Sequence, residues 1–226
     1  MVSERHEKRR VDTGIQRRVP AVNTAAEWIE ADGLGGYASG TVGTLRTRRY
    51  HGVRVTATTP PTGRMVLVAG IDVSVECGAG PESLTTQRYE PGVCHPPLAR
   101  IESFTRDPWP VWIHELGNGV RIRAEIVCTS GRARTILKWT LVGGAGPVRL
   151  TVRPLLAARD YHALQHENGA VQSADVHGRR ISWRLYRGSP DVGCVSNGQW
   201  TAEQTWFRQF LYDAERERGL DAVEAA

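Results

Sequence analysis

Polar and apolar residues alternate along most of the chain from residue 48 onward. The alternation is cleanest in segments 53–56, 119–126, 135–141, 148–153 and 180–186. A period of two places apolar side chains on one face of a strand and polar side chains on the other. Turn-forming pairs such as Asn118-Gly119 separate the runs, and helical patterns are scarce. The pattern therefore predicts an all-β fold, a large antiparallel β-sandwich of roughly ten or more short strands.

The end of the chain is ambiguous in its periodicity. Segment 206–212 fits a strand if Trp206 and Phe210 share a face with the polar Arg208, and it fits a helix if Trp206, Phe207 and Phe210 form one stripe. A highly charged stretch follows before the chain stops at Ala226. We therefore expect three regions. They are a basic, disordered tail over residues 1–20, a β-sandwich domain over 21–212, and the start of a linker toward a further domain over 213–226.

The four cysteines are scattered and form no C-x-x-C pair. Such spacing is unlike that of a metal or disulfide framework, so we expect buried free thiols in a reducing compartment. No apolar run approaches the ~20 residues of a membrane span, and no hydrophobic segment follows the charged N-terminus as in a secretory signal. A cytoplasmic protein without a membrane partner, a metal or another cofactor is the expectation.

The chain is basic, with a formal net charge of +5 and a pI near 9.3. Only Lys8 and Lys138 of the 29 basic residues are lysine, so arginine replaces lysine along the whole sequence. This usage is typical of a coding bias rather than of a local phosphate-binding patch. The densest basic run lies in the N-terminal tail, which lacks hydrophobic periodicity. We expect no nucleic-acid partner.

A glycine-rich stretch at residues 33–38, GLGGYA, matches the G-x-G-x-x-G/A fingerprint of dinucleotide-binding folds. The fingerprint has meaning only between a buried strand and a helix, where backbone amides face the pyrophosphate. Here the preceding residues are too polar for a buried strand, and the following residues 39–44 form a poor helix. We expect the glycines to shape a tight loop or to permit a close approach of another surface.

Three blocks of residues in order resemble the N-terminal domain of bacterial and archaeal-type glycogen debranching enzymes. The first block is Trp28 with segments 33–41 and 47–52. The second block comprises segments 153–156 and 159–162 with Glu167-Asn168, and the third comprises Tyr212, Glu215 and segment 218–221. The resemblance runs from about residue 26 to residue 221. It implies a large β-sandwich of the supersandwich type, followed in such enzymes by an α/α barrel of paired helices.

The resemblance also implies an activity. In these enzymes the barrel carries the catalytic carboxylates of an amylo-α-1,6-glucosidase, which removes the single glucose left at a branch point. Glycoside hydrolysis requires two facing carboxyl groups, and the loop residues Asp32, Asp160 and Glu167 are more typical of turns and caps. We therefore assign no catalytic residue to this chain and expect it to be inactive alone. Its expected partners are glycogen or limit dextrin and a catalytic barrel, in cis or in trans.

Two short clusters are candidates for contacting sugar. Aromatic rings pack against the apolar faces of sugars, and planar polar groups bind their hydroxyls. The same residue types also form contacts between loops, so a structural role of these clusters remains the alternative. For the chain as a whole, the alternative is a stand-alone carbohydrate-binding domain without catalysis. Among the tryptophans, Trp139 and Trp183 are expected in the core and Trp109 on the surface. The candidate substrate-binding residues are Arg49, Tyr50, His51, Asp160, Tyr161 and His162.

Overall fold

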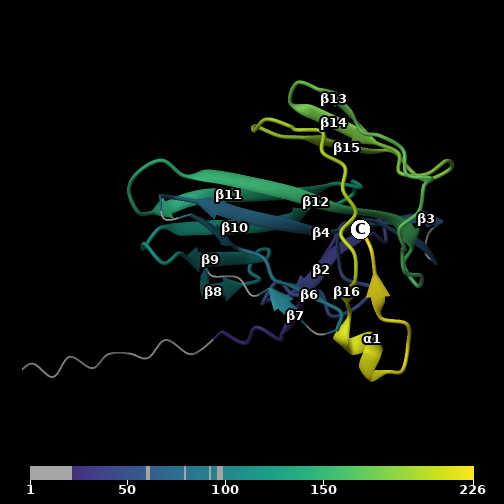
Figure 1. Cartoon of the computed structure of the whole chain (residues 1–226), viewed down its shortest axis with the longest axis horizontal. Helices are drawn as coiled ribbons and strands as arrows, with labels where there is room; N and C mark the ends of the chain where they lie inside the picture. Colours follow the sequence, from purple (N-terminus) through teal and green to yellow (C-terminus); the bar gives the residue numbers. More distant parts are fainter. Residues whose placement is uncertain (1–21, 60–61, 79, 92, 96–98) are drawn as a thin grey trace, which may run out of the picture.

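The computed structural model describes residues 22–226 except 60–61, 79, 92 and 96–98 (Figure 1). The basic tail expected over residues 1–20 lies outside the described residues. Antiparallel β-strands make up about half of the described chain, and α1 (Asp213–Glu217) is the single helix assigned there. The prediction of an all-β, antiparallel fold is confirmed.

Two larger sheets form the body of the domain. The first has the order β1-β2-β3-β4-β12, with β5 also paired to β4. Its strands are β1 (Glu27–Ala31), β2 (Tyr37–Thr41), β3 (Gly52–Thr59), β4 (Gly63–Glu76), β5 (Pro81–Ser83) and β12 (Arg149–Asp160). The second has the order β11-β10-β9-β8. Its strands are β8 (Arg100–Thr105), β9 (Val111–Glu115), β10 (Arg121–Cys128) and β11 (Thr135–Gly143).

Two smaller sheets complete the fold. The first contains β13 (Asp175–His177), β14 (Arg180–Trp183) and β15 (Val192–Val195), and Figure 1 shows it above the larger sheets. The second joins distant parts of the chain in the order β17-β16-β6-β7. Its strands are β6 (Gln87–Tyr89), β7 (Val93–His95), β16 (Phe210–Leu211) and β17 (Val223–Glu224).

The main core lies between the two larger sheets. Trp28 of β1 meets Trp112 of β9 edge-to-face, with ring centroids 5.4 Å apart, a favoured geometry for aromatic pairs. The two indole N–H groups donate to the successive carbonyls of Thr41 and Val42, at 3.1 and 2.9 Å, so neither buried donor is left unpaired. These contacts fix β1 and β9 against the turn that follows β2.

The remaining tryptophans differ in burial. Trp139 is partly buried and packs against both clusters of the main core. Trp183 is buried beneath the β13–β15 sheet, where it packs in a separate cluster with Val68 of β4. Trp109 is half-buried, and its indole N–H donates to Glu125, so it is less exposed than the flanking prolines suggested.

The glycine-rich stretch forms the turn between β1 and β2. Asp32 is buried, and its Oδ1 accepts hydrogen bonds from the backbone N–H groups of Leu34 and Gly36 at 2.8 and 2.9 Å. Its Oδ2 accepts from Arg54 at 2.9 Å. Burial alone would raise the pKa of Asp32, but the hydrogen bonds and the Arg54 charge lower it. A Cβ at Gly36 would lie 2.4 Å from Asp32 Oδ2, so only glycine fits.

This turn connects two antiparallel strands, and no helix begins after it. A dinucleotide site needs a strand–turn–helix unit, so the structure excludes that interpretation of the fingerprint. The glycines instead wrap a buried carboxylate. The expectation of a tight loop is confirmed.

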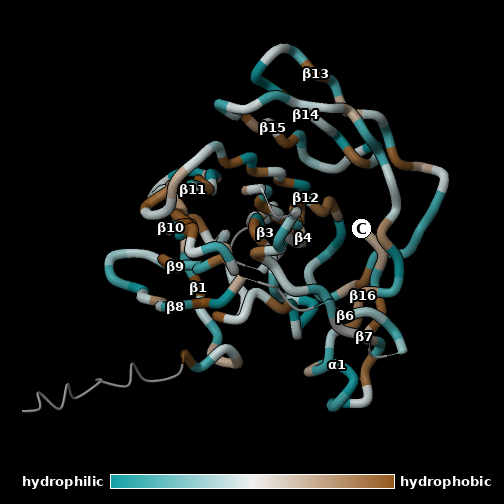
Figure 2. The backbone as a smooth tube through the Cα atoms, turned by 60° about the vertical axis from the view of Figure 1, so that its left-hand side comes forward, coloured by the Kyte–Doolittle hydropathy of each residue, from teal (hydrophilic) through white to brown (hydrophobic). Residues whose placement is uncertain are grey.

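The chain between residues 203 and 226 folds back onto the domain. Within segment 206–212, residues 206–209 form neither a strand nor a helix, whereas Phe210–Leu211 form strand β16. Segment 213–226, where we expected the start of a linker, forms the short helix α1 (Asp213–Glu217) and strand β17 in this structure. The backbones of Phe207 and Ala226 exchange two hydrogen bonds, at 2.8 and 2.9 Å. Figure 2 shows the hydrophilic turn of α1 below β16.

Candidate functional site

Two loops distant in sequence meet at one surface of the domain. Tyr50 precedes β3, while Tyr161 and His162 follow β12. The hydroxyl of Tyr50 lies 3.1 Å from Nδ1 of His162. The Tyr50 ring meets the rings of Tyr161 and His162 edge-to-face, with both centroid distances 5.6 Å. We call Tyr50, Tyr161 and His162 the aromatic cluster. Its side chains are partly or fully exposed.

Asp160 shapes the second of these loops. Its Oδ1 accepts a hydrogen bond from the backbone N–H of His162 at 2.8 Å, the local pattern by which an aspartate stabilises a turn. Asp160 is itself exposed at the end of β12. It therefore lies beside the aromatic cluster and sets the position of His162.

Arg49 connects the loop before β3 to the loop after β12. Its Nη1 and Nη2 donate to the carbonyls of His162 and Asp221, both at 2.7 Å. Its Nε lies 3.4 Å from the buried carboxylate of Glu215 in α1, which also accepts from the Arg49 backbone N–H. The side chain is 12% exposed. Arg49 therefore connects the loop after β12, residue 221 and α1.

His51 points away from the aromatic cluster. It is 3% exposed, and its Nδ1 accepts from the backbone N–H of Thr47 at 3.2 Å. Its Nε2 lies 3.4 Å from a carboxylate oxygen of Glu27. Burial lowers the pKa of His51 to about 4, so the ring is neutral at pH 7. The structure thus brings together five of the six residues proposed from sequence and separates His51 from them.

A buried polar network lies behind the cluster, and the sequence analysis did not predict it. Arg159 at the end of β12 forms an ion pair with Glu224 of β17, and both side chains are almost wholly buried. The Tyr212 hydroxyl donates to Glu224 and accepts from Arg46 at 3.1 Å. Burial raises the pKa of Tyr212 well above its usual value, so its hydroxyl stays protonated.

The network supports the aromatic cluster through Arg49. Nη2 of Arg159 donates to the carbonyl of Arg49 at 2.8 Å. The backbone N–H of Gln165, shortly after the cluster, donates to Glu224 at 3.2 Å. The loop that carries Tyr50 is therefore bonded to Arg159, and the loop after β12 is bonded to its ion-pair partner Glu224. These contacts hold the side chains of the aromatic cluster in fixed positions.

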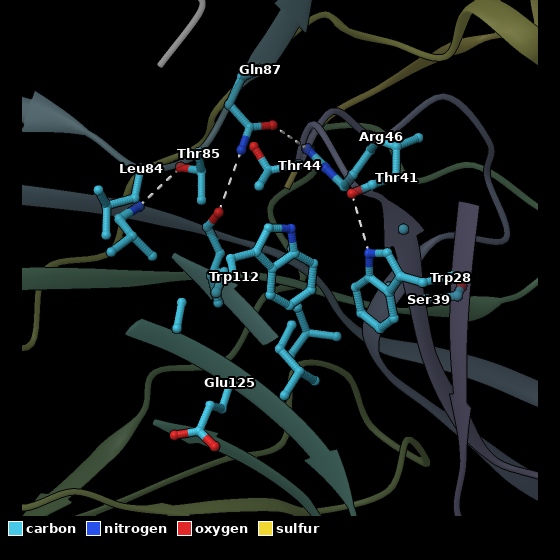
Figure 3. A pocket seen from close by; sticks show the side chains of 18 of the residues that line it. Trp28, Ser39, Thr41, Thr44, Arg46, Leu84, Thr85, Gln87, Trp112 and Glu125 are labelled. Carbon is cyan, nitrogen blue, oxygen red and sulfur yellow. Dashed lines mark hydrogen bonds between the residues drawn. The ribbon is translucent and has the colours of Figure 1, made fainter. Parts of the chain in front are cut away.

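A cavity of about 80 Å³ lies between the two larger sheets (Figure 3). Trp28 and Trp112 line its apolar part. Arg46, Thr85 and Gln87 contribute polar groups, and Figure 3 shows the hydrogen bond between Arg46 and Gln87. The lining also includes His114, whose pKa burial lowers to about 4. This cavity is distinct from the aromatic cluster.

The three loop carboxylates considered from sequence occupy different places. Asp32 is buried against Arg54, Glu167 forms an exposed ion pair with Arg208, and Asp160 stabilises its own turn. Within the described residues, no three His, Cys, Asp or Glu side chains gather in a way that could hold a metal ion. No described helix is long and apolar enough to cross a membrane.

The free thiols are not equally buried. Cys77, Cys128 and Cys194 form no disulfide, and Cys128 alone of these three is fully buried. The side chain of the fourth cysteine, Cys94, lies outside the description. The expectation of free thiols agrees with these three residues, but the expected burial holds for Cys128 only.

The fold and the surface cluster define an all-β domain that presents aromatic and polar side chains on a firmly fixed pair of loops. Comparison with protein-family models matches residues 26–226 to the family described as "Glycogen debranching enzyme N terminal". The chain belongs to this family. Comparisons with curated proteins and with solved structures found no match. The resemblance seen in the sequence is thus confirmed at the level of the family.

Proposed function

We propose that this chain is the N-terminal β-sandwich domain of a glycogen debranching enzyme and that it supports and partly lines the active site of an α-1,6-glucosidase. The substrate is glycogen or a limit dextrin. The catalytic carboxylates come from an α/α-barrel domain, in cis or in trans, in the cytoplasm. Family membership supports the class of enzyme, and the aromatic cluster is the observation that carries the role of this domain.

The cluster offers the two kinds of contact that a glucose unit requires. The Tyr50 and Tyr161 rings provide apolar faces for the C–H groups of a sugar ring. The Tyr50 hydroxyl, the His162 ring and the Asp160 carboxylate provide donors and acceptors for sugar hydroxyls. These groups lie within two adjoining loops on one surface. In this proposal they contact the glucan, while the buried or clamped side chains of His51 and Arg49 hold the loop in place.

Variants at the cluster test the proposal in a debranching enzyme that carries this domain. His162→Ala and Tyr50→Phe remove polar contacts at an exposed site, so each should lower kcat/KM on limit dextrin several-fold, as expected for a loss on the order of 1 kcal/mol. The melting temperature should change little. The matched control is His177→Ala, an exposed histidine on β13 far along the chain.

If the cluster has a structural role, we expect the opposite result for stability and kinetics. If Tyr50→Phe and His162→Ala lower the melting temperature but leave limit-dextrin kinetics equal to those of His177→Ala, the cluster does not contact substrate. Thermal melts and kinetics measured on the same preparations separate the two outcomes.

A further inference from the structure

Arg46 is a buried arginine whose hydrogen-bond partners are all neutral. It is 7% exposed. Its Nη1 donates to the Tyr212 hydroxyl at 3.1 Å and its Nη2 donates to Oε1 of Gln87 at 3.2 Å. The guanidinium carbon lies 4.3 Å from the centroid of the Phe210 ring. Nε is buried and has no hydrogen-bond partner among the described residues.

Arg46 has no carboxylate partner in the buried network. Arg159 pairs with Glu224, and Arg49 pairs with Glu215. Three guanidinium groups thus share two carboxylates, and no carboxylate of the described residues lies within ion-pair distance of Arg46. Arginine remains charged at any physiological pH. The network therefore carries a net positive charge at Arg46.

Neutral partners compensate such a charge only in part. A buried charge is costly unless it is paired as well as hydrogen-bonded. The Phe210 ring attracts the guanidinium through its π face, but this attraction is weaker than an ion pair. Tyr212 connects Arg46 to Glu224, yet Glu224 already binds Arg159 and the Gln165 amide. An additional negative charge next to Arg46 would be strongly favoured.

The cavity between the two larger sheets, which we call the intersheet cavity, could hold such a negative charge, because Arg46 lines it (Figure 3). Thr44 also lines the cavity, and its Oγ1 accepts from the backbone N–H of Thr86 at 2.8 Å, so its own hydroxyl hydrogen can be donated. His114, 2% exposed, has an Nδ1 without a partner among the described residues. The carboxylate that lines the cavity, Glu125, is bound by Arg123 and Trp109.

The glycine at position 70 is part of the same arrangement. A Cβ there would lie 3.0 Å from Arg46 Nε and 3.1 Å from its Cδ, closer than side chains normally pack. Glycine therefore lets the Arg46 side chain approach β4 closely. The arrangement positions an unpaired donor of a permanent cation at the wall of a cavity.

We propose that the Arg46 end of the intersheet cavity binds a small monovalent inorganic anion, of which chloride is the physiological example. The cavity volume of about 80 Å³ admits an ion of this size together with water, because one water takes up about 30 Å³ in the liquid. Thr44, Arg46 and His114 line it, and in this proposal the Arg46 Nε, the Thr44 hydroxyl and the His114 ring donate to the anion. The bound anion would neutralise Arg46 and so strengthen the attachment of Tyr212 and the C-terminal segment.

Thermal unfolding of the complete chain in different salts tests the proposal. Because a ligand of the native state stabilises it in proportion to its occupancy, replacing sodium gluconate by sodium chloride at constant ionic strength should raise the melting temperature saturably. Arg46→Met should abolish this response. The matched control, Arg184→Met, removes an exposed arginine paired with Asp191 and should retain it. If Arg46→Met does not fold, Thr44→Val should reduce the response.

Crystals grown with sodium bromide give a direct measurement, since bromide replaces chloride and scatters anomalously. We expect an anomalous peak in hydrogen-bond contact with Arg46 Nε. Bromide found solely beside surface arginines would overturn the proposal. So would equal melting temperatures in chloride and gluconate, or a chloride response that survives in both Arg46→Met and Thr44→Val. None of these results bears on sugar binding by the aromatic cluster.

Discussion

Arg159 and Glu224 form an ion pair in the interior of the domain although they lie 65 residues apart in sequence. Arg159 lies one residue before the end of β12, and Glu224 belongs to the two-residue strand β17. Glu224 also accepts hydrogen bonds from the Tyr212 hydroxyl and the backbone N–H of Gln165, and Arg159 donates to the Arg49 carbonyl. The pair therefore attaches the C-terminal segment to the loops that carry the aromatic cluster.

Replacing Glu224 should destabilise the domain strongly. Glu224→Gln keeps the shape of the side chain but leaves Arg159 charged and unpaired in the interior, which typically costs about 3–5 kcal/mol. Chemical denaturation should show a corresponding fall in the free energy of unfolding. The control is Asp191→Asn, which breaks an exposed pair with Arg184 and should cost less than about 1 kcal/mol. Equal losses in the two variants would contradict a special role for the buried pair.

Gly36→Ala should also be destabilising. The new Cβ would meet Asp32 Oδ2 at 2.4 Å and the Val55 carbonyl at 2.8 Å, so the Asp32–Arg54 pair must shift. We expect a loss of roughly 1–3 kcal/mol, as for overpacking in a core. Gly169→Ala serves as the control, because a Cβ there meets nothing within 4 Å. Urea titrations that show the same midpoint for both variants would refute the close approach.

The buried histidines predict a loss of stability in mild acid. The pKa of His114 is about 4 in the folded protein, against 6.5 for an ordinary histidine, and burial is the cause. Between these values the unfolded state binds more protons than the native state, so stability falls as the pH drops from 6.5 to 4. The full effect is about 3 kcal/mol for one such group. His51 adds a contribution of the same sign.

Denaturation of wild type and His114→Gln at pH 7 and pH 5 checks this effect. The variant should be less stable than wild type at pH 7. The difference between its free energies of unfolding at pH 7 and pH 5 should be smaller than in wild type. The pH 5 measurement lies above the range in which the carboxylate of Asp32, whose pKa is lowered, gains a proton. An identical pH dependence in both proteins would show that His114 is not buried in its neutral form.

The isolated chain should release no glucose from a phosphorylase limit dextrin. The sequence analysis assigned no catalytic carboxylate pair, and Asp32, Asp160 and Glu167 are each engaged in structural contacts. Glucose release by the purified chain, measured with a coupled assay, is the direct test. Robust turnover that disappears on replacing a carboxylate within residues 30–175 would disprove the prediction.

The strands could be predicted where polar and apolar residues alternate over several positions. Segments 53–56, 119–126 and 135–141 fall largely within β3, β10 and β11. Their alternation did not reveal that the polar Arg54, Thr56 and Glu125 are buried as well. The pattern fails where a strand is too short to show a period. Strands β16 and β17 have two residues each, and their pairing is determined by long-range contacts rather than by local propensity.

The candidate site was predictable only in part, because its residues are far apart in the sequence. Tyr50 and His162 are 112 residues apart, and no local rule indicates that they meet; the family resemblance pointed to both. Sequence alone did not reveal that His51 is buried, because adjacent residues in a loop face different directions without a fixed period. The buried network was missed because Arg46 and Tyr212 are separated by 166 residues.

The distance in sequence between these partners has a consequence for how the domain folds. Arg46 and Arg49 are made early in synthesis, but their partners Tyr212 and Glu215 follow 166 residues later. Until then the strands of both large sheets exist without the contacts that satisfy the buried arginines. Because contacts of such high separation slow folding, we expect a late, rate-limiting step in refolding experiments, reported by the fluorescence of Trp206. We therefore expect the C-terminal segment to dock last and the aromatic cluster to reach its final geometry only at that step.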